Sequence, residues 1–168
     1  MLEKVIAIGG EPGTGKTKLV KDIMNDFTLT PFSYGYVKGL YDEYKKVYFI
    51  GVFDGSIFDG TDRLSRKAIT DFTKFLDYAD GIVVFEGDTL FNNKLLLMNY
   101  PFIKLVLTAS NEVRGIRLQL KGNNQAEGYI NKKITKLNNI IKGHPDIVIL
   151  NNDGDNTENI NKIKNYIR

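Results

Sequence analysis

The sequence predicts a three-layer α/β domain with a mostly parallel central sheet. Short apolar segments alternate along the chain with longer stretches whose apolar residues recur at helical spacing, an order typical of strand–helix–strand units. A glycine-rich segment also joins the first apolar segment directly to the first helical stretch. The chain has 168 residues, of which 42% are hydrophobic, enough for one core and too few for two comfortable domains. We therefore expect a single domain over residues 1–168.

The composition excludes several classes of site. The chain has no cysteine and its one histidine is His144, which rules out disulfides, thiolate metal sites and a histidine zinc site. A net charge of +3 permits contact with nucleic acid without requiring it. No apolar run is long enough to span a membrane, and the first strand begins too early to leave room for a signal peptide. We expect a cytoplasmic protein with no membrane partner.

The glycine-rich segment fits the pattern G-x-x-x-x-G-K-[ST] of a phosphate-binding loop, with the strand Val5–Ile8 before it and a helical stretch after it. Its residues are Gly10, Glu11, Pro12, Gly13, Thr14, Gly15, Lys16 and Thr17. Glycines let backbone N–H groups turn toward phosphate oxygens, Lys16 reaches the β- and γ-phosphates, and Thr17 offers its hydroxyl to Mg²⁺. We expect ATP with Mg²⁺ as the ligand, and the sequence leaves GTP open.

The next segments predict an edge of the sheet. Phe32–Tyr41 alternates aromatic and β-branched residues, and after a polar turn Lys46–Phe53 does the same. They predict either a hairpin laid against the parallel sheet or a strand followed by a short crossover. Residues 54–61 predict a loop, and the apolar positions from Ala68 to Ala79 predict a helix.

Gly81–Glu86 is a continuous apolar run that ends in an acid, which is typical of a central parallel strand buried on both faces. Because α/β sheets bind ligands at the carboxyl ends of their strands, we expect Glu86 to stand near the Mg²⁺ held by Thr17. The alternative is a solvated acid that merely ends a strand.

The second half of the chain continues the alternation. Val113–Gln125 is rich in Arg, Gln, Gly and Asn and weak in periodicity, so it predicts a mobile segment within a small lid over about residues 111–128. Asn111 is the expected cap of that segment. The other expected elements are a helix at Thr89–Asn99, a strand at Phe102–Leu107, a helix at Ile130–Ile141, a strand at Ile147–Leu150 and a helix at Ile160–Ile167.

Two groups of charged residues suit phosphoryl transfer to a hydroxyl. A carboxylate can orient the hydroxyl and accept its proton, and Asp54, which ends a strand, is our first choice, with Asp62 the second. Arg63, beside Asp62, can neutralise charge. Arg114 and Arg117, spaced i, i+3 on one helix face, can stabilise the transferring phosphoryl group, although a solvated cationic face explains such a pair equally well.

With these residues placed, the whole chain resembles the small P-loop kinases of the nucleoside and nucleotide kinase class. Phe58–Ser65 and Val84–Phe91 more narrowly resemble segments of phage-encoded P-loop kinases, including the 5-hydroxymethyluracil DNA kinases. That resemblance implies transfer from ATP to the 5-hydroxymethyl group of a base already in DNA, with DNA carrying modified thymine as the partner and the host cytoplasm as the location.

Two alternatives stay open at this point. One is a kinase of a free nucleoside or (deoxy)nucleoside monophosphate. The other is a P-loop NTPase that acts as a switch, which the lack of an N-K-x-D segment disfavours. The sequence does not indicate an oligomeric state.

Overall fold

The computed structural model describes residues 1–56, 58–122 and 126–168. The strands are β1 (Leu2–Gly10), β2 (Thr30–Tyr34), β3 (Val37–Asp42), β4 (Val47–Ile50), β5 (Gly81–Glu86), β6 (Phe102–Thr108) and β7 (Val148–Asn151). The helices are α1 (Lys16–Met24), α2 (Ala68–Tyr78), α3 (Asn93–Leu96), α4 (Asn111–Leu120), α5 (Glu127–Gly143) and α6 (Thr157–Ile167), with a 3₁₀ turn, η1, at Thr61–Arg63. Within the described ranges no helix is both long and apolar enough to cross a membrane.

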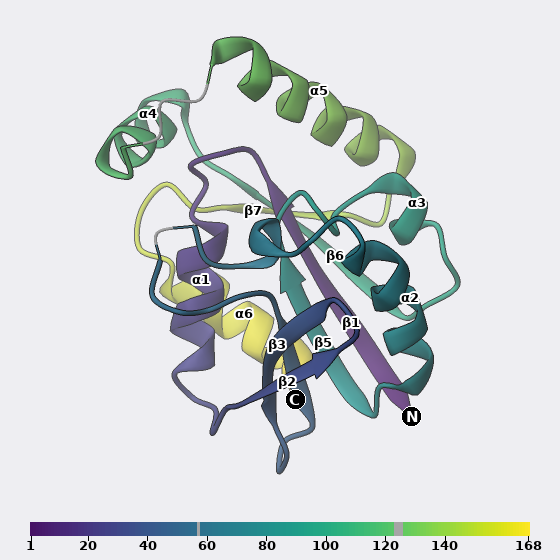
Figure 1. Ribbon diagram of the computed structural model, residues 1–168. Coiled ribbons are helices and arrows are strands. Elements are labelled where there is room, and N and C mark those ends of the chain that lie inside the picture. The colour runs from purple at the N-terminus through teal and green to yellow at the C-terminus, as the bar shows by residue number, and fades with distance from the viewer. Residues whose placement is uncertain (57, 123–125) are drawn as a thin grey trace.

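The strands form one seven-stranded sheet in the order β2-β3-β4-β5-β1-β6-β7 (Figure 1). From β4 to β7 each strand is parallel to its neighbour, whereas β3 is antiparallel to β4 and β2 is antiparallel to β3. This arrangement confirms the predicted α/β class with a mostly parallel sheet and an antiparallel addition at one edge.

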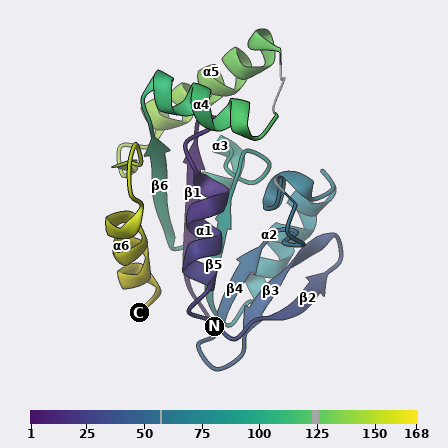
Figure 2. The same cartoon turned by 90° about the vertical axis from the view of Figure 1, so that its left-hand side faces the viewer.

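Helices cover both faces of the sheet. Phe85 of β5 faces the apolar cluster under α2, α3 and α5, and Val84 faces the cluster under α1 and α6. Both faces of β5 are therefore buried, which explains its unbroken apolar sequence. Figure 2 shows α4 and α5 lying across the end of the sheet at which α1 begins. That end carries the phosphate-binding loop.

The antiparallel edge differs from the prediction. Phe32–Tyr41 is not one strand, because it folds back at Gly35 and Tyr36 into β2 and β3, with Tyr34 paired to Val37. Gly35 has a φ of 57°, which a two-residue hairpin turn requires and a glycine readily supplies. The predicted hairpin against the sheet exists as β3–β4, so the alternative of a short crossover is wrong.

Two later segments also differ. The helix predicted at Thr89–Asn99 is reduced to α3, because Leu90 and Phe91 insert into the core before Asn92 caps the helix. Val113–Gln125 is a regular helix as far as Leu120 and is capped by Ser110 rather than by Asn111. Its weak periodicity has a physical cause, since α4 buries none of its residues. Residues 123–125 of that prediction lie outside the described residues.

A buried histidine connects the elements beside α5. His144 Nε2 lies 2.7 Å from Asn93 Oδ1, and Nδ1 lies 3.1 Å from Lys104 Nζ, which also pairs with Asp146 at 3.0 Å. Because an ammonium group only donates, Nδ1 accepts from Lys104 and the Nε2–H donates to Asn93. Burial, together with the nearby Lys104 charge, lowers the pKa of His144, so the native imidazole is neutral.

Stability should therefore fall when the medium is acidified. As the pH drops below about 6.5, the unfolded chain takes up a proton at His144 that the folded chain resists, and the free energy of unfolding decreases. The variant His144→Gln should lose about 1–2 kcal/mol at neutral pH and show a weaker dependence on pH between 7 and 5. Urea unfolding at a series of pH values measures both effects. Identical pH slopes for the two proteins would contradict this account.

Candidate active site

The phosphate-binding loop joins β1 to α1 at the carboxyl end of the parallel strands. Gly13 and Gly15 have φ values of 83° and 89°, left-handed conformations that turn backbone N–H groups toward the centre of the loop. Lys16 Nζ donates to the carbonyl oxygens of Gly10 at 2.8 Å and Glu11 at 3.1 Å. Its ammonium group thus lies across the loop, where phosphate oxygens can take the place of those two acceptors.

A cavity of about 110 Å³ opens beside this loop. The residues predicted from the sequence that line it are Pro12, Gly13, Gly15, Lys16, Thr17, Asp62 and Glu86. The structure therefore brings together the loop, the acid that ends β5 and one of the two aspartates considered as the base.

Glu86 ends β5 with its side chain buried against the start of α1. Thr17 Oγ1 lies 3.3 Å from Glu86 Oε1. Burial raises the pKa of Glu86 to about 7, although the nearby Lys16 charge opposes that rise. The carboxylate is thus not the solvated acid of the alternative interpretation.

The chain leaves room for this carboxylate by placing a glycine beside it. A Cβ atom on Gly60, whose φ is 116°, would stand 1.9 Å from Glu86 Oε1. Gly60 is in turn fixed by a two-way backbone bridge to Val52, with N···O distances of 3.1 and 2.9 Å. A side chain at residue 60 would push the acid out of the cavity.

A hydroxyl and a carboxylate at this spacing fit the needs of Mg²⁺ bound with a nucleotide. Such ions are held by one or two protein oxygens together with phosphates and water, rather than by a cage of side chains. Accordingly, among the described residues no group of three or more His, Asp or Glu side chains forms a metal cage. Thr17 and Glu86 are the residues that would hold the ion.

Asp62 reaches the cavity from the 3₁₀ turn η1. Its Oδ1 atom accepts from the backbone N–H of Thr89 at 3.2 Å and from the Thr89 hydroxyl at 3.1 Å. Gly87 makes this approach possible, because a Cβ there would stand 3.0 Å from Asp62 Oδ1. The carboxylate is thereby fixed in orientation at the rim of the cavity.

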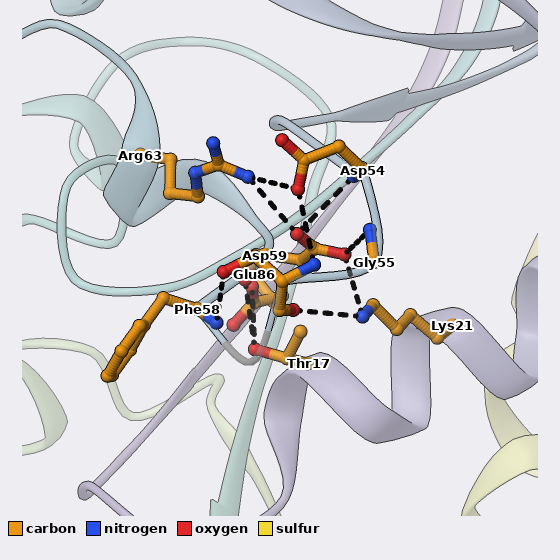
Figure 3. A network of polar contacts seen from close by, with 9 residues as sticks. Thr17, Lys21, Asp54, Gly55, Phe58, Asp59, Arg63 and Glu86 are labelled. Atoms are coloured by element: carbon orange, nitrogen blue, oxygen red, sulfur yellow. Dashed lines mark hydrogen bonds and ion pairs between the residues drawn. The ribbon is translucent and has the colours of Figure 1, made fainter. Parts of the chain in front are cut away.

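Asp54 and Arg63 lie outside the cavity lining. Figure 3 shows Arg63 directed toward Asp54 and Asp59, away from Thr17. Arg63 forms an ion pair with Asp54 and a second one, at 3.3 Å, with Asp59. The Arg63 guanidinium lowers the pKa of the half-exposed Asp54 carboxyl to about 2. The expectation that Asp54 ends a strand is wrong, because β4 already ends at Ile50, and the Asp54 side chain does not line the cavity.

Arg114 and Arg117 do share one face of α4, but that face contacts the outside of the phosphate-binding loop. Arg114 forms an ion pair with Glu11. Arg117 donates to the carbonyl oxygens of Gly13 at 3.3 Å and Asn152 at 2.6 Å. Neither arginine lines the cavity, so in this conformation both attach α4 to the loop.

Several cavity residues were not predicted. They are Phe58, Asp59, Asp88, Leu118, Lys121 and Lys133. Burial, with the repulsion of Lys16, lowers the pKa of Lys121. Burial also acts to lower the pKa of Lys133, but its ion pair with Asp88, at 3.1 Å, leaves that pKa raised. Lys121 comes from the weakly periodic Val113–Gln125 segment and Lys133 from the helix predicted at Ile130–Ile141, and in neither segment does the sequence carry a signal that distinguishes these lysines from surface lysines.

Comparisons with known proteins identify the fold. No protein-family model matches the chain, and no curated protein matches it in sequence. Among solved structures, a deoxyadenosine kinase from M. mycoides, with the products dCMP and a flexible dCDP bound, superposes with a TM-score of 0.50. The match covers 97% of this chain and 98% of that chain at 14% sequence identity. At this identity the likeness shows a shared fold alone.

The glycine at residue 60 allows a direct test of the site. Gly60→Ala should destabilise the protein by more than Gly55→Ala, because both glycines have positive φ but a Cβ on Gly55 meets nothing within 4 Å. We expect about 1–2 kcal/mol for the backbone conformation alone in Gly55→Ala, and a larger loss in Gly60→Ala from displacement of Glu86. Urea unfolding measures both. Equal losses would show that the carboxylate is not confined as described.

Proposed function

We propose that this chain is an ATP-dependent kinase that transfers the γ-phosphoryl group either to a hydroxyl of a nucleoside or to the phosphate of a (deoxy)nucleoside monophosphate. The observation that carries the proposal is the convergence of two kinds of group in one cavity. The phosphate-binding Lys16 and the hydroxyl of Thr17 meet the carboxylates of Glu86 and Asp62 there. The first pair suits the donor phosphates and the second suits a metal ion and an acceptor hydroxyl.

The donor nucleoside has a groove next to the loop. This groove, of about 370 Å³, includes Gly15, Arg117 and Asn156 among its lining residues and lies where the start of α6 approaches α1. The planar guanidinium of Arg117 offers a surface on which a base can stack. Phosphates in the loop and a base in this groove would place the γ-phosphoryl group toward the cavity with Glu86.

The cavity provides charge neutralisation mainly from lysines. Lys121 at the end of α4 and Lys133 on α5 line it together with Lys16. A transferring phosphoryl group carries negative charge on its peripheral oxygens, so ammonium groups around it lower the barrier. Mg²⁺, when bound, adds further neutralisation of the phosphates, with Thr17 and Glu86 as its protein contacts.

Asp62 is better placed than Asp54 to act as the proton acceptor. It lines the cavity, and its hydrogen bonds with the described residues use Oδ1, which leaves Oδ2 to an acceptor hydroxyl. Asp54 is paired with Arg63 and has a pKa of about 2, which makes it a weak base. We therefore assign the role of base to Asp62.

The choice of acceptor follows the structural comparison. A fold shared over almost the whole chain with a deoxyadenosine kinase supports a free nucleoside or nucleotide acceptor. No observation on the described residues favours a 5-hydroxymethyl group in DNA, and none favours a switch whose output is conformational. A kinase of small nucleosides or nucleotides is therefore the function that the site supports best.

Incubation with labelled ATP and Mg²⁺ tests the acceptor. We expect label on one or more deoxynucleosides or their monophosphates, and none in Lys16→Ala, because that substitution removes the phosphate-binding ammonium group. Hydroxymethyluracil-containing duplex and thymine-containing duplex serve as the contrasting acceptors. Preferential labelling of the first duplex, with a steep loss at higher salt, would instead support DNA as the substrate. Release of phosphate to water alone would contradict kinase function.

The base assignment makes a separate prediction. Asp62→Asn should lower turnover by about 10²-fold or more while leaving ATP binding nearly unchanged, since it removes a positioned base and keeps the hydrogen bonds from Thr89. Asp54→Asn, the matched control, should lower turnover by less than about 10-fold, because Asp54 acts only through its ion pair with Arg63. Steady-state kinetics on both variants decide the matter. A larger loss of turnover in Asp54→Asn than in Asp62→Asn would instead identify Asp54 as the base.

A further inference from the structure

The hydroxyl of Thr17 has a second hydrogen-bond acceptor nearby in addition to Glu86. Thr17 Oγ1 lies 3.3 Å from the main-chain carbonyl oxygen of Asp59 and at the same distance from Glu86 Oε1. One hydroxyl hydrogen thus has two acceptors. A hydroxyl that coordinates Mg²⁺ does so through a lone pair, so its hydrogen must point to an acceptor away from the ion. Once Glu86 faces the ion, the carbonyl of Asp59 is the acceptor that remains.

The position of that carbonyl is set by the Asp59 side chain, which is completely buried. Figure 3 shows its carboxylate between Lys21 and Arg63, at distances of 2.7 and 3.3 Å. The same carboxylate accepts from the backbone N–H groups of Gly55 at 3.0 Å and Asp54 at 3.4 Å. Four donors therefore hold one buried carboxylate, and removing its charge would leave them without an ionised partner.

Lys21 connects this arrangement to Thr17 through α1. The two residues are four apart on one helix and so lie on the same face, one turn from each other. Lys21 also donates to the carbonyl oxygen of Ser56 at 3.3 Å. The helix that carries the metal-binding hydroxyl therefore also anchors the loop that supplies its hydrogen-bond acceptor.

We infer that Asp59 is a positioning residue for the metal site: its carboxylate, held by Lys21 and Arg63, fixes its own carbonyl oxygen against the hydroxyl of Thr17. The inference rests on the proposed nucleotide-binding function. It gives Arg63 the role of a counter-charge to the buried Asp59 carboxylate in place of a contact to substrate. Second-sphere groups of this kind typically change metal affinity by about 10- to 100-fold when they are removed.

Calorimetric titration with a non-hydrolysable ATP analogue, with Mg²⁺ and with EDTA, tests the inference without using activity. In the wild-type protein Mg²⁺ should tighten binding. We call the ratio of the affinity with Mg²⁺ to the affinity in EDTA the metal-dependent gain. Asp59→Asn should lower this gain by about 10- to 100-fold and leave the affinity in EDTA unchanged. In a Thr17→Val background, where the hydroxyl is absent, Asp59→Asn should cause no further loss, because it acts through that hydroxyl.

Two lysine variants provide a matched comparison. Lys21→Met removes one partner of Asp59 and should reduce the metal-dependent gain in the same direction, by less than Asp59→Asn. Lys164→Met removes a similar ion pair, with Asp26 after the far end of α1, and should leave the gain unchanged. If Asp59→Asn fails to fold, the comparison of these two lysine variants decides the question.

Three outcomes would overturn the inference. The first is an unchanged metal-dependent gain in folded Asp59→Asn. The second is an equal loss of nucleotide affinity with Mg²⁺ and with EDTA in that variant. The third is a loss of affinity from Asp59→Asn that adds fully to the loss caused by Thr17→Val. Failure of the nucleotide-binding function on which the inference rests is distinguishable, because the wild-type protein would then bind no nucleotide under either condition. Failure of kinase activity alone is seen separately, in the assay with labelled ATP.

Discussion

The burial of one carboxylate at the end of β5 is the constraint on which the site depends. Ile8 of β1 lies opposite Glu86 in the parallel register, so the phosphate-binding loop and the acid leave the sheet at the same level. A carboxylate in that position is costly to ionise, and its pKa of about 7 reflects the cost. Binding of a divalent cation favours the ionised form, so the same burial that disfavours the free charge makes the position suited to a metal-bound nucleotide.

Close approach of main chain to main chain makes this burial possible. A Cβ on Gly51 would stand 2.6 Å from the carbonyl carbon of Gly60, and a Cβ on Gly60 would overlap the Glu86 carboxylate. The loop after β4 can therefore lie directly on the acid, with its own buried Asp59 carboxylate paired with Arg63 and Lys21. The geometry of the cavity is set by which residues lack side chains as much as by which residues have functional ones.

The sequence was sufficient to predict the phosphate-binding loop, the buried β5 and the position of Glu86, because each depends on a local pattern and on the rule that parallel strands present their carboxyl ends together. The sequence was insufficient to predict the conformation of the loop after β4 and which of its aspartates lines the cavity. Asp54 and Asp59 both stand in a Phe-Asp-Gly sequence, yet only Asp59 of these two lines the cavity. The Val52–Gly60 bridge that closes this loop is a contact that no periodicity reveals. Lys121 escaped prediction for a related reason, since α4 buries no residue and leaves no apolar stripe to orient it.

The attachment of α4 follows from that lack of apolar burial. A helix with no buried residue needs polar contacts to hold it, and arginine, with five donors in a fixed fork, can bind several carbonyl oxygens at once. Arg114 and Arg117 use this capacity on Glu11, Gly13 and Asn152, all in or beside the phosphate-binding loop. The helix that carries Leu118 to the cavity is thereby attached to the glycine-rich loop. These polar contacts, and not burial of residues of α4 in the core, therefore hold the helix beside the loop.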